Sequence, residues 1–183
     1  MKKKNWGIRI VCLLMFLGLS SMVLLSIYKL SAENGTVSNE RSETVTETIK
    51  EEVNTKLNDR GLALADKIKY YVILYSPYGS DWNSNIRKLA HFSIYFALAC
   101  MVYITFAILG VKKTLRLLLT ILLCFCFAMV DEYHQGFTGR TSAMSDVYLD
   151  TFGGICASIV LTIISWIITG IRYGINKSCG IEN

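Results

Sequence analysis

Four long apolar runs dominate the pattern of the chain. The second and fourth, Ala90 to Val111 and Thr151 to Ile171, approach or exceed the roughly 20 residues that a helix needs to cross a bilayer. The first, Ile10 to Tyr28, carries no charge. In the third only Leu117 to Val130 is uncharged, and Arg116 would lengthen it by placing its guanidinium at the surface. The pattern predicts an all-α, polytopic membrane helix bundle with four transmembrane helices.

The first apolar run follows a basic stretch, which is typical of both signal peptides and membrane anchors. Lys2, Lys3, Lys4 and Arg9 precede it. A secretory signal has an apolar region of roughly 7 to 15 residues and a small-residue cleavage site. This run is longer, and no clear cleavage site follows it. Residues 1–30 are therefore predicted to form a cytoplasmic N-terminus and an uncleaved signal anchor.

Basic residues near the ends of the runs set the predicted orientation. With four crossings they all fall on one side of the membrane: Lys2, Lys3, Lys4, Arg9, Lys112, Lys113, Arg116, Arg172 and Lys177. Cytoplasmic loops carry an excess of such residues, so the N and C termini are both predicted to be cytoplasmic. Residues 31–88 then form an extracytoplasmic segment, residues 89–175 a three-span core and residues 176–183 a cytoplasmic tail.

The extracytoplasmic segment carries two patterns of its own. Thr44 with Glu47 resembles a capping box, and apolar residues recur every four positions at Val45, Ile49, Val53 and Leu57. They predict a short amphipathic helix, which either lies on the membrane surface or packs over the outer ends of the spans. The tyrosine-rich stretch from Tyr70 to Tyr78, followed by Trp82, favours the headgroup zone.

Composition agrees with a membrane protein and argues against other classes. Hydrophobic residues make up 52% of the chain and charged residues only 18%. The net charge of +5 does not indicate a nucleic-acid partner, because the basic residues lie at the ends of apolar runs without aromatic residues between them. Five of the six cysteines lie inside apolar runs, so neither a disulfide framework nor a cysteine zinc site is predicted. Neither a Gly-rich phosphate loop nor a Gly-x-Ser-x-Gly elbow is present, and no cofactor is predicted.

Three polar clusters lie at the predicted non-cytoplasmic helix ends. They are Arg87, Lys88 and His91 at the second span; Asp131, Glu132, His134 and Gln135 at the third; and Arg140, Asp146 and Asp150 at the fourth. Arg87, His91 and Tyr95 share one helical face, and Asp146, Asp150 and Gly154 share another, because each set repeats every four residues. Small residues at positions 153, 154, 157 and 158 would let the fourth helix approach a neighbour closely. The clusters are therefore expected to meet in space.

The same clusters carry a resemblance to a known family. The motifs are, in order, Arg87-Lys88-Leu89-Ala90-His91-Phe92, Asp131-Glu132-Tyr133-His134-Gln135, Gly139-Arg140 and Ser145-Asp146-Val147 through Asp150-Thr151 to Gly153. They resemble the ordered motifs of VanZ-like proteins, over all four spans. The resemblance implies a bacterial cell-membrane protein, and the founding member is linked to resistance to the glycopeptide teicoplanin. The chain departs from the pattern at Thr138, where many members have Pro, and at Ile94, where many have an acidic residue.

Three functions fit the polar clusters. In the first, they form a structural ion-pair network in which Arg140 holds Asp131 or Asp146 bidentately. In the second, Arg87, Lys88 and Arg140 contact phosphate or carboxylate groups of a cell-wall lipid intermediate or a glycopeptide. In the third, an envelope enzyme uses a histidine as general acid or base.

For the enzyme, the candidate residues are His91, oriented by Asp131 or Glu132, and His134 as the alternative base. A metal site is not predicted, because Asp-Glu-x-His lacks the two-histidine spacing of helical zinc sites. Transport is disfavoured, because the charges lie at one membrane surface. The chosen hypothesis is ligand binding at the outer leaflet with an influence on teicoplanin susceptibility. Its expected ligand-binding residues are Arg87, Lys88, His91, Tyr95, Asp131, Glu132, Gln135, Arg140, Asp146 and Asp150.

Overall fold

The computed structural model is built from helices throughout the residues it describes, which are 6–76, 78–138, 140 and 142–179. Six α-helices follow one another in the described chain: α1 (Trp6–Ser31), α2 (Gly35–Lys56), α3 (Asp59–Tyr75), α4 (Trp82–Leu109), α5 (Lys113–Phe137) and α6 (Met144–Ser178). The all-α fold class is confirmed. Lys2, Lys3, Lys4, Gly139 and residues 180–183 of the predicted tail lie outside the described residues.

Four of the helices, α1, α4, α5 and α6, are long and apolar enough to cross a membrane. Helices α1, α5 and α6 contain their predicted runs and extend them at both ends, whereas α4 begins ahead of the second run, at Trp82, and ends at Leu109, two residues before the predicted Val111. The third run, Leu117 to Val130, is extended at both ends, because α5 runs from Lys113 to Phe137. Arg116, Asp131 and Glu132 therefore lie within this helix. The four-span prediction is confirmed, and the acidic residues of the third run belong to the helical span.

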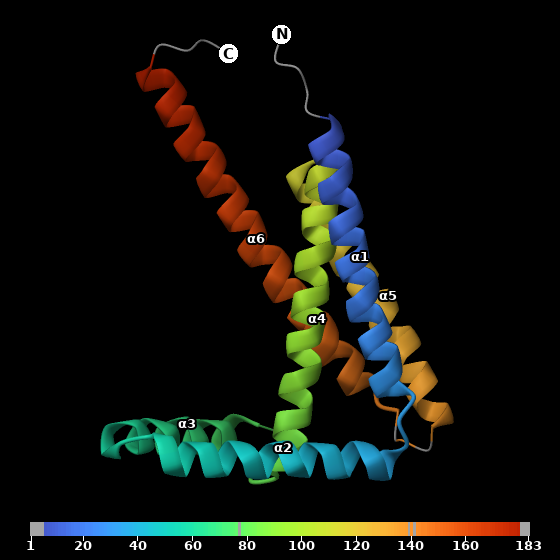
Figure 1. Ribbon diagram of the computed structural model, residues 1–183, viewed down its shortest axis with the longest axis vertical. Helices are drawn as coiled ribbons and strands as arrows, with labels where there is room; N and C mark the ends of the chain where they lie inside the picture. Colours follow the sequence, from blue (N-terminus) through green and yellow to red (C-terminus); the bar gives the residue numbers. More distant parts are fainter. Residues whose placement is uncertain (1–5, 77, 139, 141, 180–183) are drawn as a thin grey trace.

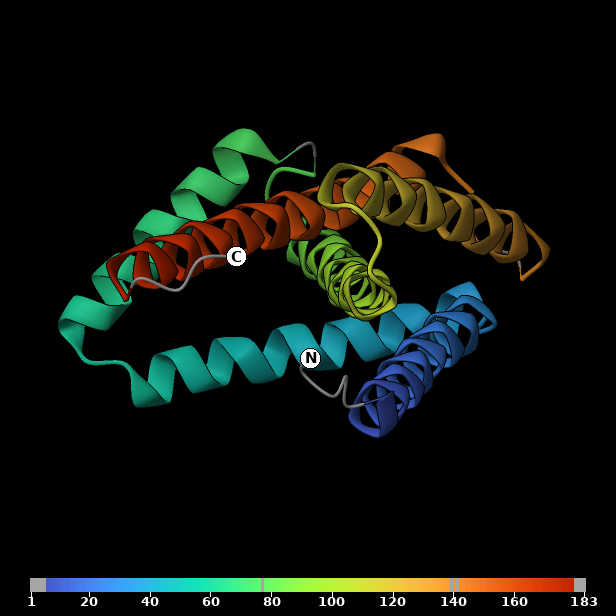
Figure 2. The ribbon, with the colours of Figure 1, turned by 90° about the horizontal axis from the view of Figure 1, so that it is seen from above.

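Helix α4 lies at the centre of the bundle and packs against α1, α5 and α6 (Figures 1 and 2). The end of α1, the start of α4, the end of α5 and the start of α6 meet at one end of the bundle (Figure 1). Trp6 and Ser178, the first residue of α1 and the last of α6, lie toward the opposite end. This arrangement fits an even number of crossings, and the cytoplasmic position of the termini stays a prediction.

Two adjacent glycines allow α6 to cross its neighbours closely. A Cβ atom on Gly153 would lie 2.5 Å from the backbone oxygen of Phe92 on α4, and one on Gly154 would lie 2.8 Å from Cβ of Cys124 on α5. Ala157 and Ser158 are buried one turn further along. The predicted small-residue contact surface is thus confirmed, and it fixes the place where α4, α5 and α6 meet.

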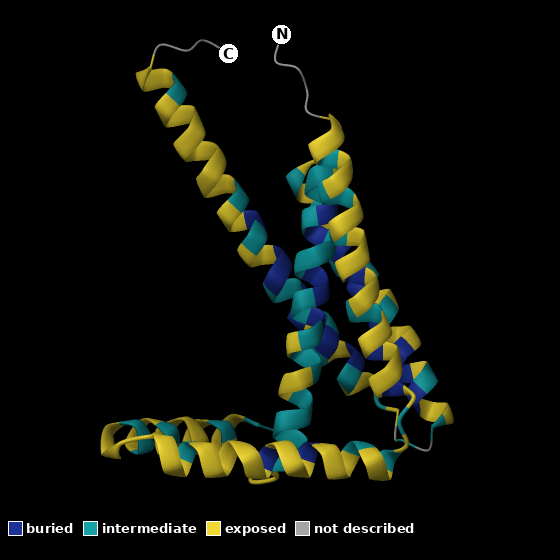
Figure 3. Cartoon of the chain, viewed as in Figure 1, coloured by how far each residue is buried: buried dark blue, intermediate teal, exposed yellow. Residues whose placement is uncertain are grey.

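Burial is concentrated where these helices cross (Figure 3). Tyr95, Leu98, Ala99, Cys124 and Ala157 are among the buried core residues. The opposite half of α6 is different, because every residue from Trp166 to Ile175 is exposed. Exposed apolar surface on a membrane span faces lipid rather than water, which accounts for the many uncovered isoleucines of α6.

Basic side chains close the end of the bundle that carries the start of α5. Arg9 Nη2 donates to the backbone oxygen of Ile108 at 2.5 Å, and Lys113 Nζ donates to Thr169 Oγ1 at 2.7 Å. The Arg116 guanidinium lies over the Tyr103 ring, 5.0 Å from its centre. Arg9, Lys113 and Arg116 thus lie at the same end of the bundle, which is the end predicted to be cytoplasmic.

Helices α2 and α3 lie across the other end of the bundle, at a steep angle to the spans (Figure 1). Asn34 and Asn58 cap their N-termini by accepting hydrogen bonds from the amides of Val37 and Gly61. The predicted capping box at Thr44 is wrong, because α2 is already helical there and Thr44 Oγ1 donates to the backbone oxygen of Glu40. The amphipathic helix itself exists, and it is longer than predicted.

Polar residues of α2 are buried against the bundle, whereas part of its apolar stripe is exposed. The helix packs against α4, and its buried residues are Ser42 and Thr46. Val45 and Ile49 of the predicted apolar stripe are exposed. Ser42 and Thr46 lie on the same side of the helix as the stripe, because Val45, Thr46 and Ile49 follow Ser42 by three, four and seven residues. This side of α2 therefore covers the start of α4 and leaves Val45 and Ile49 exposed beside it.

Candidate functional site

The three polar clusters meet at the bundle end that α2 covers. Arg87, Lys88 and His91 come from the first turns of α4, whose N-terminus is capped by Asp81; its side chain accepts the Ser84 amide at 3.2 Å. Hydrogen bonds from Ser84 lower the pKa of Asp81, which keeps the cap ionised. The α5 cluster and the α6 cluster face this helix, as expected from the spacing.

A lysine and an aspartate join α4 to α6 at this end. Lys88 Nζ forms an ion pair with Asp146 Oδ2, and both side chains are largely covered. Lys88 also lies 5.7 Å from the centre of the Tyr78 ring. An ion pair between two of the clusters was expected. It is formed by Lys88 and Asp146, whereas the sequence hypothesis placed it at Arg140.

One helical turn deeper, His91 faces two buried carboxylates. His91 Nδ1 lies 3.5 Å from Asp150 Oδ2. One ligand atom from each of His91, Asp131 and Asp150 lies within 4.8 Å of the other two. Asp150 has no exposed surface and Asp131 only 6%. The carboxylate that orients His91 is therefore Asp150, whereas the sequence hypothesis gave this role to Asp131 or Glu132.

The two acidic residues at the end of α5 have separate partners. Gln135 Nε2 donates to Asp131 Oδ2 at 2.9 Å, within the same helix. Glu132 Oε2 accepts the backbone amide of Ala143 at 2.9 Å, which ties the start of α6 back to α5. Asp131 therefore belongs to the histidine cluster, while Glu132 holds the connection between the two helices.

Arg140 does not form the predicted clamp. Within the described residues it makes no ion pair with Asp131 or Asp146, and its Nη1 donates to the backbone oxygen of Leu30 at 3.3 Å. Its side chain thus reaches the end of α1. Burial, and after it the neighbouring Arg87, lower the pKa of Arg140. Among the described residues, no carboxylate lies within ion-pair distance of this guanidinium, although Asp131, Glu132 and Asp146 are near enough to attract its charge.

His134, the alternative base, lies against α1 instead of the His91 cluster. Its Nδ1 is 3.1 Å from Ser31 Oγ, and its ring centre is 4.9 Å from that of Tyr28. Thr138, the position where many VanZ-like proteins have Pro, donates from Oγ1 to the backbone oxygens of Gln135 and Ser31. Both residues fasten the end of α5 to α1.

A cavity of about 420 Å³ opens above the ion pair and the histidine cluster. It is lined by Gly35, Asn39, Tyr78, Arg87, Lys88, Gln135, Arg140, Ala143, Ser145 and Asp146. Three of these side chains are cationic and one is a carboxylate, so the cavity has an excess of positive charge. It brings together five of the predicted ligand-binding residues: Arg87, Lys88, Gln135, Arg140 and Asp146.

The other five predicted residues do not line this cavity. His91, Asp131 and Asp150 form the deeper cluster, Tyr95 is fully buried one turn beyond His91, and Glu132 holds Ala143. Sequence reasoning missed Asn39 and Tyr78. Both lie in the segment between α1 and α4, and no local pattern indicates that α2 crosses over the start of α4.

Comparison with known proteins agrees with the motifs. A family model for VanZ/LLP1 proteins matches residues 10–165, which is most of the chain. No curated protein and no solved structure matches it. The four apolar helices and the match together establish that the chain is a multi-pass membrane protein and belongs to the VanZ/LLP1 family.

Proposed function

We propose that this protein binds the anionic head of a lipid-linked cell-wall intermediate, or a glycopeptide, at the outer leaflet of the membrane. The observation that carries the proposal is the cavity lined by Arg87, Lys88 and Arg140. Its volume of about 420 Å³ falls within the range of small-molecule sites. Through this binding the protein influences susceptibility to teicoplanin.

The charge balance of the cavity favours an anion. Lys88 is paired with Asp146, but neither Arg87 nor Arg140 forms an ion pair with a carboxylate within the described residues. Two neighbouring guanidinium groups repel each other unless an anion lies between them. Arginine presents several N–H donors in a planar fork that fits phosphate and carboxylate oxygens. A diphosphate or a carboxylate-bearing peptide supplies the missing negative charge.

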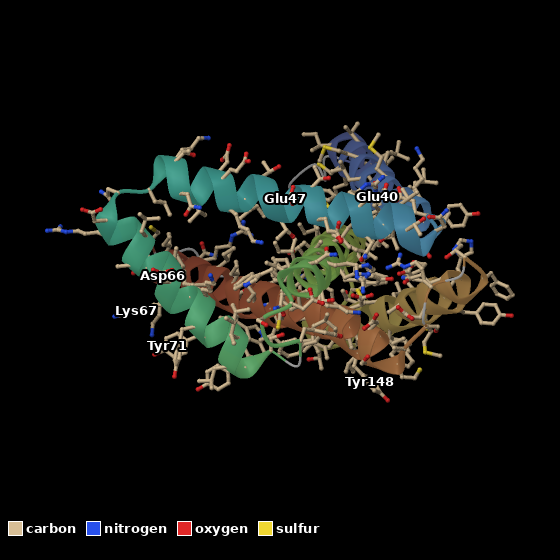
Figure 4. The ribbon with its side chains drawn as sticks, turned by 90° about the horizontal axis from the view of Figure 1, so that it is seen from below. Glu40, Glu47, Asp66, Lys67, Tyr71 and Tyr148 are labelled. Atoms are coloured by element: carbon tan, nitrogen blue, oxygen red, sulfur yellow. The ribbon has the colours of Figure 1, made fainter. Side chains whose placement is uncertain are left out.

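The position of the cavity fits a ligand that is held in the membrane by its tail. The cavity lies where α4 and α6 begin, at the end of the bundle opposite the basic contacts of Arg9 and Lys113. Helix α3 extends beside this end, and Lys67 and Tyr71 point away from the bundle (Figure 4). Tyrosine and lysine favour the headgroup zone. A ligand in this cavity would therefore lie at the level of the lipid headgroups.

Binding measurements on the protein in nanodiscs test the proposal. We expect saturable binding of lipid II or teicoplanin to the wild type, and a loss of about 10-fold to 100-fold in affinity for Arg87→Ala or Arg140→Ala, because a hydrogen bond to a charged group contributes about 1.5–3 kcal/mol. Arg60→Ala is the matched control. It removes one positive charge from α3 but none from the lining of the cavity.

Two results would contradict the proposal. One is the absence of binding above the level of empty discs for both ligands. The other is an equal loss for Arg60→Ala and Arg87→Ala, which would mean that only the general positive charge of the outer surface matters.

The pair of His91 and Asp150 favours a second candidate, an envelope enzyme acting on the same ligand. A carboxylate that faces one nitrogen of an imidazole fixes its orientation and raises its basicity, as a general base requires. Hydrolysis of a bound phosphate or ester group by the wild type, abolished by His91→Ala in a protein that still inserts and still binds ligand, would establish this candidate.

A further inference from the structure

The cluster of His91, Asp131 and Asp150 lies directly beneath the cavity. Each member is four residues from a residue that lines the cavity: His91 from Arg87, Asp131 from Gln135, and Asp150 from Asp146. Four residues correspond to about one helical turn. The three side chains thus come from three different helices and converge one turn further into the bundle.

Among the described residues, His91 is the one basic side chain that lies within ion-pair distance of a carboxylate of this cluster. Asp150 is fully buried, and apart from His91 Nδ1, which lies 3.5 Å from its Oδ2, neither of its carboxylate oxygens has a donor among the described residues. The Asp131 carboxylate accepts a hydrogen bond from Gln135 Nε2, and the Ser31 side chain is a second polar neighbour. The nearest lysine on α4, Lys88, is engaged with Asp146. Two buried carboxylates that share one imidazole are unfavourable, because each charge has lost its water and repels the other.

A second observation comes from Tyr95, one turn beyond His91 on the same face of α4. Its side chain is fully buried, and its hydroxyl has no hydrogen-bond partner among the described residues. It lies close enough to Asp131 and Asp150 to interact electrostatically with both. Buried tyrosine hydroxyls usually find a partner. An unpartnered hydroxyl beside two buried carboxylates that share one imidazole is the arrangement expected around a ligand that completes the site.

We propose that His91 Nδ1 and one carboxylate oxygen each from Asp131 and Asp150 bind a divalent transition-metal cation, Zn²⁺ or Mn²⁺. One imidazole and two carboxylates form a donor set that these ions accept. Metal–ligand bonds of about 2.0–2.2 Å place neighbouring donor atoms about 3.4 Å apart. The present separations of up to 4.8 Å close to that value through rotation of the side chains.

The surroundings provide the outer hydrogen bonds that such sites use. Gln135 already donates to Asp131, and the Tyr95 hydroxyl is available to a bound carboxylate or to a water on the ion. Hydrogen bonds of this kind orient the ligands and strengthen metal binding. Three protein ligands leave at least one coordination position open. The cation goes beyond the proposed lipid binding, and its presence does not depend on that proposal.

Metal binding to the full-length protein in nanodiscs tests this inference without any lipid ligand. After removal of metal with a chelator, the wild type is titrated with Zn²⁺ against a fluorescent indicator and with Mn²⁺ by electron paramagnetic resonance. We expect one ion per chain for at least one of the two metals. Asp150→Asn and His91→Ala should each weaken binding at least 10-fold. Glu40→Gln removes a carboxylate of α2 outside the cluster and should bind as the wild type does.

Thermal unfolding separates lost binding from lost folding. The metal should raise the Tm of the wild type and of Glu40→Gln, and leave that of Asp150→Asn unchanged. The proposal is overturned if the metal-free wild type shows no saturable binding of either ion. It is equally overturned if Asp150→Asn binds as tightly as the wild type, since the bound ion would then lie elsewhere. Failure of lipid II binding with intact metal binding would contradict the proposed function alone.

Discussion

At the scale of single residues, the helix crossing depends on two glycines, which allow close contact because they have no Cβ atom. Gly153 lies against the backbone of α4, and Gly154 against Cys124 of α5. Backbone atoms cannot move aside as a flexible side chain can, so Gly153 is the more sensitive of the two positions. The same contact brings Asp150, one turn earlier, toward His91 on the facing helix. The close packing and the polar cluster are therefore two results of one helix crossing.

Replacing Gly153 by Ala is expected to destabilise the protein by about 1–3 kcal/mol, the usual cost of overpacking a tight contact. The added Cβ would lie 2.5 Å from the Phe92 backbone oxygen. Gly170→Ala is the matched control on the same helix, because nothing lies within 4 Å of its Cβ position. Unfolding in mixed detergent micelles measures both. Equal stability of the two variants would show that α6 does not approach α4 this closely.

Residue spacing predicted the faces of the polar clusters but not their partners. The four-residue repeats correctly placed His91 with Arg87 and Asp150 with Asp146. Which face of one helix meets which face of another depends on the crossing, and nothing local to His91 distinguishes Asp150 from Asp131 or Glu132. Because Arg140 is positively charged, we expected it to pair with a carboxylate. It donates instead to the backbone oxygen of Leu30, and sequence cannot indicate such a partner because every residue has a backbone oxygen.

At the scale of elements, the four spans can be predicted from the sequence more completely than the two connecting helices, α2 and α3. Long apolar runs determine α1, α4, α5 and α6, because the bilayer thickness sets a minimum length. Helix α2 was recognised from an apolar repeat but begins at Gly35, ahead of Thr44. Helix α3 was not predicted, because its tyrosine-rich end was interpreted by its preference for headgroups rather than by its backbone. Helix propensity alone predicts such helices poorly, because packing or membrane contact supplies most of their stability.

The exposed apolar stripe of α2 leads to a prediction about the membrane. Val45→Ser with Ile49→Ser is expected to loosen α2 from the bilayer and to raise amide hydrogen exchange across residues 35–56, because burial of apolar side chains drives binding of interfacial helices. Thr44→Ser with Thr48→Ser, on exposed polar positions of the same helix, is the control. Unchanged exchange in the first variant would mean that α2 is held by α4 alone.

At the scale of the whole molecule, the two ends of the bundle have different chemistry. One end carries Arg9, Lys113 and Arg116, which bond to backbone oxygens and hydroxyls or lie over an aromatic ring. The other carries the cavity, the histidine cluster and the two helices that cross the spans. The excess of positive charge in cytoplasmic loops then predicts that the cavity faces the cell exterior.

Cysteine labelling tests this orientation. In a cysteine-free background, Ser80→Cys should react with a membrane-impermeant maleimide in intact cells, because residue 80 is exposed beside the start of α4. A variant that keeps only Cys179, exposed at the end of α6, should react only after the membrane is permeabilised. The reverse result would place the cavity in the cytoplasm and exclude an outer-leaflet ligand.

Helix α6 has a further consequence for the molecule in its bilayer. It runs without interruption for 35 residues, about 52 Å at 1.5 Å per residue, against a hydrocarbon thickness of about 30 Å. The apolar residues from Trp166 to Ile171 are exposed and would face acyl chains in a bilayer, so hydrophobic mismatch with the surrounding lipids is expected to affect the tilt of α6. Asp146 and Asp150 lie on the first turns of the same rigid helix. A thicker or thinner membrane would therefore shift these two carboxylates relative to Lys88 and His91, which makes the geometry of the site sensitive to lipid composition.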